Sequence, residues 1–357
     1  MNFRRVLITG GAGFLGSSIA LLLREAFPDA QISAFDNLKR RGSELNVPRL
    51  KQHSVTFIHG DVRCEEDIAV VPDFDLLIEC AAEPSVQAGL TGGALPVISA
   101  NTMGTVNCLE AARRCGAAFL FVSTSRVYPI PLLNGLQFVE KPTRFQWENA
   151  QAMEGFSPNG ISESFPLVGG PRSIYGATKF ASELFIQEYA YSYKMPALID
   201  RCGILAGPWQ MGKIDQGVLT LWVASHLFEK PLSYCGFGGT GKQVRDMLHV
   251  RDFFDLLLLQ LRQPSLWDGR VYNVGGGWDG AVSLAELTAL CQSAAGRKIS
   301  LGANPQTSPV DLRIYVTDSS LVKRTFGWQP RRRPPEIVAD VHRWLCDHRE
   351  QLQTVFS

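Results

Sequence analysis

The sequence predicts an α/β fold, with a doubly wound parallel sheet followed by a smaller α+β region. Three observations lead to this prediction. Over roughly the first 200 residues, short apolar runs rich in β-branched residues alternate with longer segments of helical periodicity. A glycine-rich turn follows the first apolar run, and after about residue 203 the regular alternation ends. At 357 residues the chain is long enough for about two domains.

Each predicted strand in the first third of the chain is short and apolar. These strands are Val6–Ile8, Gln31–Phe35, Val55–Ile58, Leu76–Glu79 and Ala118–Val122. The intervening helices are clearest at Phe14–Phe27 and Asn101–Arg114, where Val106, Leu109 and Ala112 recur on one helical face. Because strands separated by helices run in the same direction, this order predicts a parallel sheet.

Later segments are less regular. A long helix is expected from Tyr175 through Tyr193, a strand at Arg270–Val274 and a helix at Pro335–Leu345. The expected boundary separates residues 1–202 from 203–357, with segments near 248–275 returning to the first domain.

One segment, Pro129–Arg172, contains six prolines, several aromatic residues and little periodicity. A stretch of this length without regular structure is often a functional lid. Both a lid over a ligand and a passive insertion remain open for it.

Composition limits the classes of partner. The chain has 35 basic and 34 acidic residues, so no overall charge draws it to nucleic acid or to an anionic membrane. Its eight cysteines include no CxxC pair, which favours core thiols in a reducing compartment over a metal site. The N-terminus enters an apolar strand without a signal-type region. A cytoplasmic protein with a small-molecule partner is expected.

A glycine motif follows the first strand. Residues 10–16 read Gly-Gly-Ala-Gly-Phe-Leu-Gly and fit GxGxxG from Gly11 or GxxGxxG from Gly10, with Gly13 and Gly16 shared. Such glycines allow a tight turn and bring a pyrophosphate to the N-terminus of a helix. The pattern predicts a Rossmann-type dinucleotide site.

Two acidic residues follow the next two strands. Asp36 stands 20 residues after Gly16, where a carboxylate binds the ribose hydroxyls of an adenosine and repels a 2′-phosphate. NAD is therefore favoured, although the basic residues 39–41 leave NADP as an alternative. Asp61 is suited to accept from the adenine amino group, and a helix N-cap is its alternative role.

A second constellation is suited to proton transfer. Tyr175 and Lys179 are four residues apart on one predicted helix, so their side chains lie on the same face. A nearby ammonium favours the phenolate form of a tyrosine, which can then act as a base. The hydroxyls of Ser123, Thr124 and Ser125 lie at a strand end, and each could bind a substrate oxygen.

Taken together, these motifs resemble the extended short-chain dehydrogenase/reductase family, the nucleotide-sugar epimerases and dehydratases. The similarity covers nearly the whole chain and is carried by Gly10–Gly16, Asp36, Asp61, Cys80–Ala82, Asn101, Ser123–Tyr128, Tyr175, Lys179 and Val244–Asp246. It implies an NAD-binding domain at 1–202 and a sugar-nucleotide-binding region at 203–357. It also implies a nucleotide-sugar substrate and a homodimer or homotetramer.

The resemblance assigns roles to individual residues. The catalytic set becomes Thr124, Tyr175 and Lys179. The cofactor contacts it implies are Gly10, Gly13, Phe14, Leu15, Gly16, Asp36, Asn37, Asp61, Val62, Ala81, Ala82, Asn101, Tyr175 and Lys179. The substrate contacts it implies are Thr124, Ser125, Arg245 and Arg313. No metal is expected.

Within this family, the sequence is most similar to the epimerases that invert C2 of a CDP-hexose. Ser123–Tyr128, Ile214–Gly217 and Gly241–His249 carry that similarity. A 4,6-dehydratase would be expected to have an Asp-Glu pair after the catalytic threonine, where this chain has Ser125-Arg126. The alternatives are a UDP-sugar 4-epimerase and, from another class, a dinucleotide-binding protein without turnover.

Overall fold

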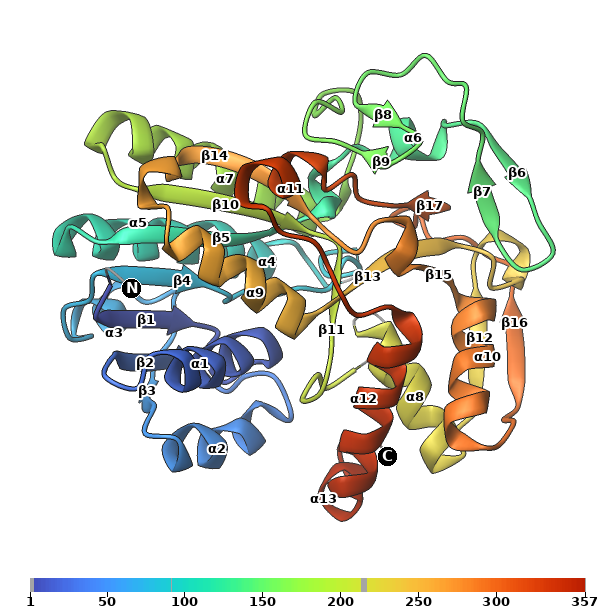
Figure 1. Ribbon diagram of the computed structural model, residues 1–357, viewed down its shortest axis with the longest axis horizontal. Coiled ribbons are helices and arrows are strands. Elements are labelled where there is room, and N and C mark those ends of the chain that lie inside the picture. The colour runs from blue at the N-terminus through green and yellow to red at the C-terminus, as the bar shows by residue number, and fades with distance from the viewer. Residues whose placement is uncertain (1–2, 91, 213–216, 357) are drawn as a thin grey trace. The chain divides into compact units, whose positions relative to one another are not determined.

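The computed structural model describes residues 3–90, 92–212 and 217–356 (Figure 1). Residues 214–216, which contribute to the 2-epimerase similarity, lie outside the described residues. The chain divides into two compact units. Unit 1 comprises Met1–Thr124, Ser173–Arg201 and Phe254–Tyr272, and unit 2 comprises Ser125–Arg172, Cys202–Phe253 and Asn273–Ser357. The chain thus passes between the units several times, and the proline-rich segment belongs to unit 2.

Unit 1 is built on a seven-stranded sheet of order β14-β10-β5-β4-β1-β2-β3. Its strands are β1 (Arg5–Thr9), β2 (Gln31–Asp36), β3 (Thr56–His59), β4 (Leu76–Glu79), β5 (Ala118–Thr124), β10 (Ala197–Cys202) and β14 (Asp268–Val274). β1 to β5 pair in parallel, with Ile8 beside Ala34 of β2 and Ile78 of β4. The predicted parallel α/β sheet is confirmed.

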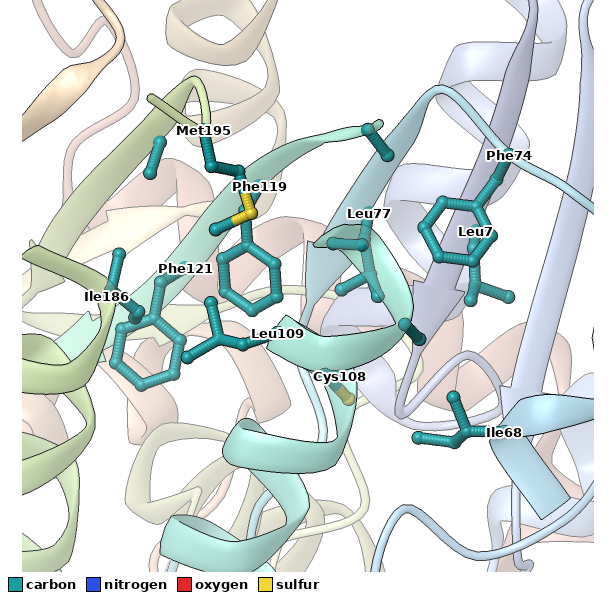
Figure 2. Close-up of a cluster of buried hydrophobic side chains, with 14 of the residues drawn as sticks. Leu7, Ile68, Phe74, Leu77, Cys108, Leu109, Phe119, Phe121, Ile186 and Met195 are labelled. Carbon is teal, nitrogen blue, oxygen red and sulfur yellow. The ribbon is translucent and has the colours of Figure 1, made fainter. Parts of the chain in front are cut away.

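Helices cover this sheet, and the described ones are α1 (Phe14–Ala26), α2 (Asn46–Gln52), α3 (Glu65–Ala69), α4 (Leu95–Ile98), α5 (Gly104–Cys115), α7 (Ser173–Tyr193), α9 (Val250–Leu261), the π-helical turn η2 (Ser99–Met103), and the 3-10 turns η1 (Ser43–Leu45) and η5 (Pro264–Leu266). Leu109 of α5 and Ile186 of α7 are fully buried with Phe119 and Phe121 of β5 (Figure 2). Burying each such side chain stabilises the fold by about 1.5–3 kcal/mol. The core therefore fixes α5 and α7 against the centre of the sheet.

Unit 2 is an α+β assembly. Its helices are α6 (Ile130–Asn134), α8 (Val218–Phe228), α10 (Leu284–Ala295), α11 (Ser320–Phe326), α12 (Pro334–Asp347), α13 (Arg349–Gln353) and the 3-10 turns η3 (Ser125–Val127), η4 (Phe237–Gly239) and η6 (Trp278–Gly280). Its larger sheet has the order β11-β13-β15, with β17 also paired to β13. These strands are β11 (Ile204–Ala206), β13 (Val244–His249), β15 (Ala281–Ser283) and β17 (Ile314–Tyr315). β12 (Leu232–Cys235) pairs with β16 (Leu301–Asn304). In the described ranges, no helix is long and apolar enough to cross a membrane.

The proline-rich segment 129–172 is more ordered than its composition suggests. After α6 it forms two hairpins, β6 (Phe138–Glu140) with β7 (Phe145–Trp147) and β8 (Phe156–Ser157) with β9 (Gly160–Ile161). Phe145 N–H donates to the carbonyl of Lys242 at 2.9 Å, and Ile161 N–H donates to that of Val316 at 2.9 Å. Ser283 Oγ donates to the carbonyl of Thr143 at 2.7 Å. These bonds tie the segment into unit 2 along its length.

Candidate active site

The strand order of unit 1 reverses between β1 and β4, with β2 on one side and β5 on the other. In open α/β sheets, ligands bind outside the carboxyl ends of the strands at such a point. Gly10–Gly16 follow β1, Asp36 ends β2, Ala81–Ala82 follow β4 and Thr124 ends β5. The fold therefore brings these four sequence-predicted groups to one edge of one sheet.

The glycine turn packs closely against the start of α1. Gly10 has a φ of +64°, and a Cβ atom on Gly16 would lie 2.3 Å from the Gly10 carbonyl oxygen. Gly13 is the N-cap of α1 and has no side-chain cap, so the amides of Phe14 and Leu15 in the first turn have no intrahelical acceptor. Free amides and the positive end of a helix form a site for a pyrophosphate. The turn therefore fits a dinucleotide.

Asp36 lies beside this turn and is partly buried. Its carboxylate accepts from the N–H groups of Ala12 at 3.1 Å and Leu38 at 2.7 Å. Burial raises the pKa of Asp36, and these backbone hydrogen bonds act in the opposite direction. The carboxylate is thus held against the glycine turn, where an adenosine ribose would lie.

Asp61 follows β3 and is held by its neighbours. Its carboxylate forms a 2.5 Å ion pair with Arg63 and accepts from Asn37 Nδ2 at 2.9 Å. The hydrogen bond from Arg63 holds the pKa of Asp61 well below its usual range, so the group is an acceptor at neutral pH. Val62 is fixed next to it by Asn107 Nδ2, which donates to the Val62 carbonyl at 2.9 Å.

Asn101 is buried in the π-helical turn η2 and its side chain is engaged by protein groups. Its Oδ1 accepts from the Glu83 N–H at 2.7 Å, while its Nδ2 donates to the Glu83 carbonyl at 3.2 Å and to Thr178 Oγ1 at 3.0 Å. Asn101 therefore joins the loop after β4 to α7. π-helical turns occur frequently at functional sites.

The three hydroxyls at the end of β5 have different surroundings. Ser123 is buried, and its Oγ donates to Glu183 of α7 at 2.5 Å. Thr124 is the last residue of β5 and is 9% exposed. Ser125 opens the 3-10 turn η3 and is the first residue of unit 2. Of the three, Ser123 is engaged in the core, which leaves Thr124 as the hydroxyl at the sheet edge of unit 1.

Tyr175 and Lys179 both lie in α7, which packs against β5. Lys179 is 2% exposed, and its Nζ lies 3.7 Å from the centroid of the Phe121 ring. An ammonium over an aromatic face is stabilised by the ring's electrons. The predicted one-turn spacing therefore places Lys179 over the sheet with Tyr175 one turn closer to the start of the helix.

A buried ion pair anchors the next turn of α7, and sequence analysis did not identify it. Arg201 Nη2 lies 2.6 Å from Glu183 Oε2, and the two side chains are 4% and 1% exposed. Glu183 follows Lys179 by four residues, so helical spacing places the two on one face of α7. That spacing does not indicate Arg201 as a partner, because Arg201 lies in β10.

The predicted substrate arginines lie in unit 2. Arg245 of β13 forms a 2.9 Å ion pair with Asp311 and donates to the carbonyl of Leu312 at 2.6 Å. Arg313 lies over the rings of Phe138 at 4.1 Å and Phe237 at 5.2 Å. Both guanidinium groups are thus held in place by unit 2 itself, whereas the predicted cofactor and catalytic residues belong to unit 1.

Comparison with known proteins gives consistent matches along the chain. A model of the NAD dependent epimerase/dehydratase family matches residues 6–275. The CDP-paratose 2-epimerase of Salmonella typhi is 28% identical over 352 residues, which cover 95% of this chain and 98% of that protein. The structure of a double mutant of the dTDP-glucose 4,6-dehydratase DesIV of Streptomyces venezuelae, with NAD bound, has a TM-score of 0.78 and 26% identity, covering 98% of this chain and 99% of that one. The UDP-glucose 4-epimerase of Thermus thermophilus, in complex with NAD, has a TM-score of 0.74 and 27% identity, covering 95% and 98%.

Proposed function

Because this chain belongs to the NAD dependent epimerase/dehydratase family, we propose that it inverts C2 of a CDP-hexose through a transient 2-keto sugar. The observation that carries the proposal is the combination of a dinucleotide turn with Tyr175 and Lys179 on one helix of the same unit. Similarity to the CDP-paratose 2-epimerase over 98% of that protein supports the choice of carbon and nucleotide.

The residues of unit 1 hold the cofactor in this proposal. Amides of the turn at Gly13–Gly16 bind the pyrophosphate, Asp36 accepts from the adenosine ribose, and Lys179 donates to the nicotinamide ribose. Bound NAD supplies a reversible acceptor of hydride. The same residues fix its position relative to Thr124 and Tyr175.

Proton transfer belongs to Tyr175. The Thr124 hydroxyl hydrogen-bonds the reacting sugar oxygen and orients it. Tyr175 Oη takes the proton of the C2 hydroxyl as the hydride leaves C2, which produces the ketone. After the sugar presents its other face, hydride returns to C2 and Tyr175 gives the proton back. The hydride and the proton both return to the sugar, so the reaction has no net redox change.

Dehydration is disfavoured by the residues after Thr124. Elimination of water needs an acid and a base beside the reacting carbons. The chain has Ser125 and Arg126 where a 4,6-dehydratase would be expected to have an Asp-Glu pair. Arg126 Nη1 donates to the carbonyl of Val310 at 2.9 Å and offers no carboxyl group.

The second candidate is a UDP-sugar 4-epimerase that uses the same three residues through a 4-keto sugar. Similarity to the UDP-glucose 4-epimerase of T. thermophilus supports it. A dinucleotide-binding protein without turnover is the third candidate. Thr124, Tyr175 and Lys179 together disfavour it, because binding alone needs the glycines but no proton shuttle.

The test incubates the protein and NAD with CDP-hexoses and, in parallel, UDP-hexoses, and follows the sugar by NMR. We expect inversion at C2 of a CDP-hexose without accumulation of NADH. Inversion at C4 of a UDP-hexose would select the second candidate, and free NADH in stoichiometric amount would exclude both.

A matched variant tests the proton shuttle. Tyr175→Phe keeps the ring and removes the hydroxyl, so turnover should fall by about 10²-fold or more. NAD affinity, measured by quenching of intrinsic fluorescence, should stay near that of the wild type. Turnover at the normal rate would place the shuttle elsewhere.

A further inference from the structure

A buried acidic residue, Glu79, lies at the carboxyl end of β4. Its side chain is 0% exposed. In the sheet it pairs with Thr9 of β1 and with Phe121 of β5. Partners in adjacent parallel strands point to the same face and lie about 4.8 Å apart. Glu79 is therefore beside the ring that carries the Lys179 ammonium.

One oxygen of this carboxylate, Oε1, is held by a hydroxyl of α5. Thr105 Oγ1 lies 2.7 Å from Glu79 Oε1. Thr105 Oγ1 also lies 2.6 Å from the Asn101 carbonyl and 3.2 Å from Ser182 Oγ, so it belongs to a buried network with α7. Glu79 Oε2 has no hydrogen-bond partner among the residues that the structure describes. A carboxylate in this position needs a counter-charge.

The titratable groups that interact with Glu79 lie on α7, on α5 and at the next position in the chain. Lys179 of α7 interacts with it electrostatically, as do the thiols of Cys80, next to it in the chain, and Cys108 of α5. Burial raises the pKa of Cys80 to about 12 and that of Cys108 well above its usual value, so both thiols stay neutral. Lys179 is the cation of this group.

We propose that Glu79 is a positioning residue, the buried counter-charge of Lys179, and that it sets the pH at which the Tyr175–Lys179 pair releases its proton. The inference deepens the proposed function and rests on it for the role of Tyr175. Glu79 acts through Lys179.

The direction of the effect follows from charge. Burial raises the pKa of Glu79 to about 7, while the charge of Lys179 opposes that shift. Above this pH, Glu79 is ionised and its negative charge holds the proton on the neighbouring pair. Glu79→Gln removes the charge and keeps an oxygen for Thr105. The pair in the variant should therefore lose its proton at a pH lower by about one unit or more.

A matched control exists in the same sheet. Asp200 of β10 is also 0% exposed, and burial raises its pKa to about 7 as well. Its Oδ1 accepts from Gln260 Nε2 at 2.9 Å, and Lys179 is not among the groups that shift its pKa. Asp200→Asn thus removes a comparable buried acid while leaving the pair at Tyr175 alone.

The experiment measures three properties of the full chain. pH-difference infrared spectra of the wild type should show a protonated-carboxyl band that disappears near pH 7. Part of this band should be missing in Glu79→Gln, and another part should be missing in Asp200→Asn. An absorbance titration should show the tyrosinate signal, defined as the component that Tyr175→Phe lacks, at lower pH in Glu79→Gln. The rising limb of kcat/KM against pH should move in the same direction. Asp200→Asn should leave both of these unchanged.

Unchanged tyrosinate titration in a folded Glu79→Gln protein would overturn the proposal, and so would an equal shift in Asp200→Asn. The first two measurements need no sugar substrate. If they succeed while no nucleotide sugar is turned over, the proposed reaction is wrong and the role of Glu79 stands.

Discussion

The ion pair between Glu183 and Arg201 should dominate the stability of α7. Arg201 Nε lies 3.0 Å from both carboxylate oxygens of Glu183, and Nη2 lies 2.6 Å from Oε2. Arg201→Met removes these contacts and leaves the buried Glu183 anion with the hydrogen bond from Ser123. Breaking one side of a buried pair costs about 3–5 kcal/mol. In a unit of this size, that is a fall of roughly 10 °C in Tm.

Thermal unfolding followed by circular dichroism measures this loss. The matched control is the double variant Arg201→Met/Glu183→Leu, which removes both charges and fills their volume with apolar groups. It should recover most of the stability, less about 1 kcal/mol for the hydroxyl of Ser123 that loses its acceptor. A single variant with a Tm near the wild type, or a double variant as unstable as the single one, would refute the reasoning.

Two further predictions concern unit 1. Because burial raises the pKa of Asp200 from 3.8 to about 7, its contribution to stability is full below about pH 3.8 and is lost as pH rises through about 7. Asp200→Asn should therefore match the wild type at pH 4 and exceed it by up to about 4 kcal/mol at pH 8, in unfolding curves at the two pH values. Gly16→Ala places a Cβ atom 2.3 Å from the Gly10 carbonyl oxygen and should abolish NAD binding in a fluorescence titration. Gly116 has a φ of +62°, and a Cβ added there would lie within 4 Å of no described residue other than its chain neighbours. Gly116→Ala should therefore cost about 1 kcal/mol and leave NAD affinity unchanged.

Much of unit 1 could be predicted because its signals are local. The apolar run at Leu76–Glu79 matches β4, and the one at Gln31–Phe35 lacks one residue of β2. The long helix expected from Tyr175 through Tyr193 begins at Ser173 and ends at Tyr193. Strand runs flanked by glycine and helical periodicity are properties of neighbouring residues, so one sequence is enough to read them.

The order within segment 129–172 could not be predicted because it depends on distant residues. The strand at Phe145–Trp147 is completed by hydrogen bonding to Lys242, and Ile161 by bonding to Val316. Such pairings leave no periodic pattern in a segment of two- and three-residue strands. The partners lie about 100 residues away or more along the chain.

The burial of Glu79 could not be predicted from the sequence for a different reason. In the sequence it reads as the polar end of an apolar strand, where a carboxylate is expected to meet solvent. Its burial depends on α5 and α7, which supply Thr105 and Lys179. The same holds for Ser123, one of the three hydroxyls that could bind a substrate oxygen. Its hydrogen bond to Glu183 engages it in the core instead. Both assignments require tertiary contacts between elements far apart in the chain.

The reacting carbon is the central claim, and isotopic labelling tests it most directly. Substrate carrying deuterium at C2 of the hexose should be converted with a primary isotope effect, because the C2–H bond breaks in the proposed step. Substrate carrying deuterium at C4 should be converted at the unlabelled rate. An isotope effect at C4 with none at C2 would contradict the account and assign the chain to the 4-epimerases.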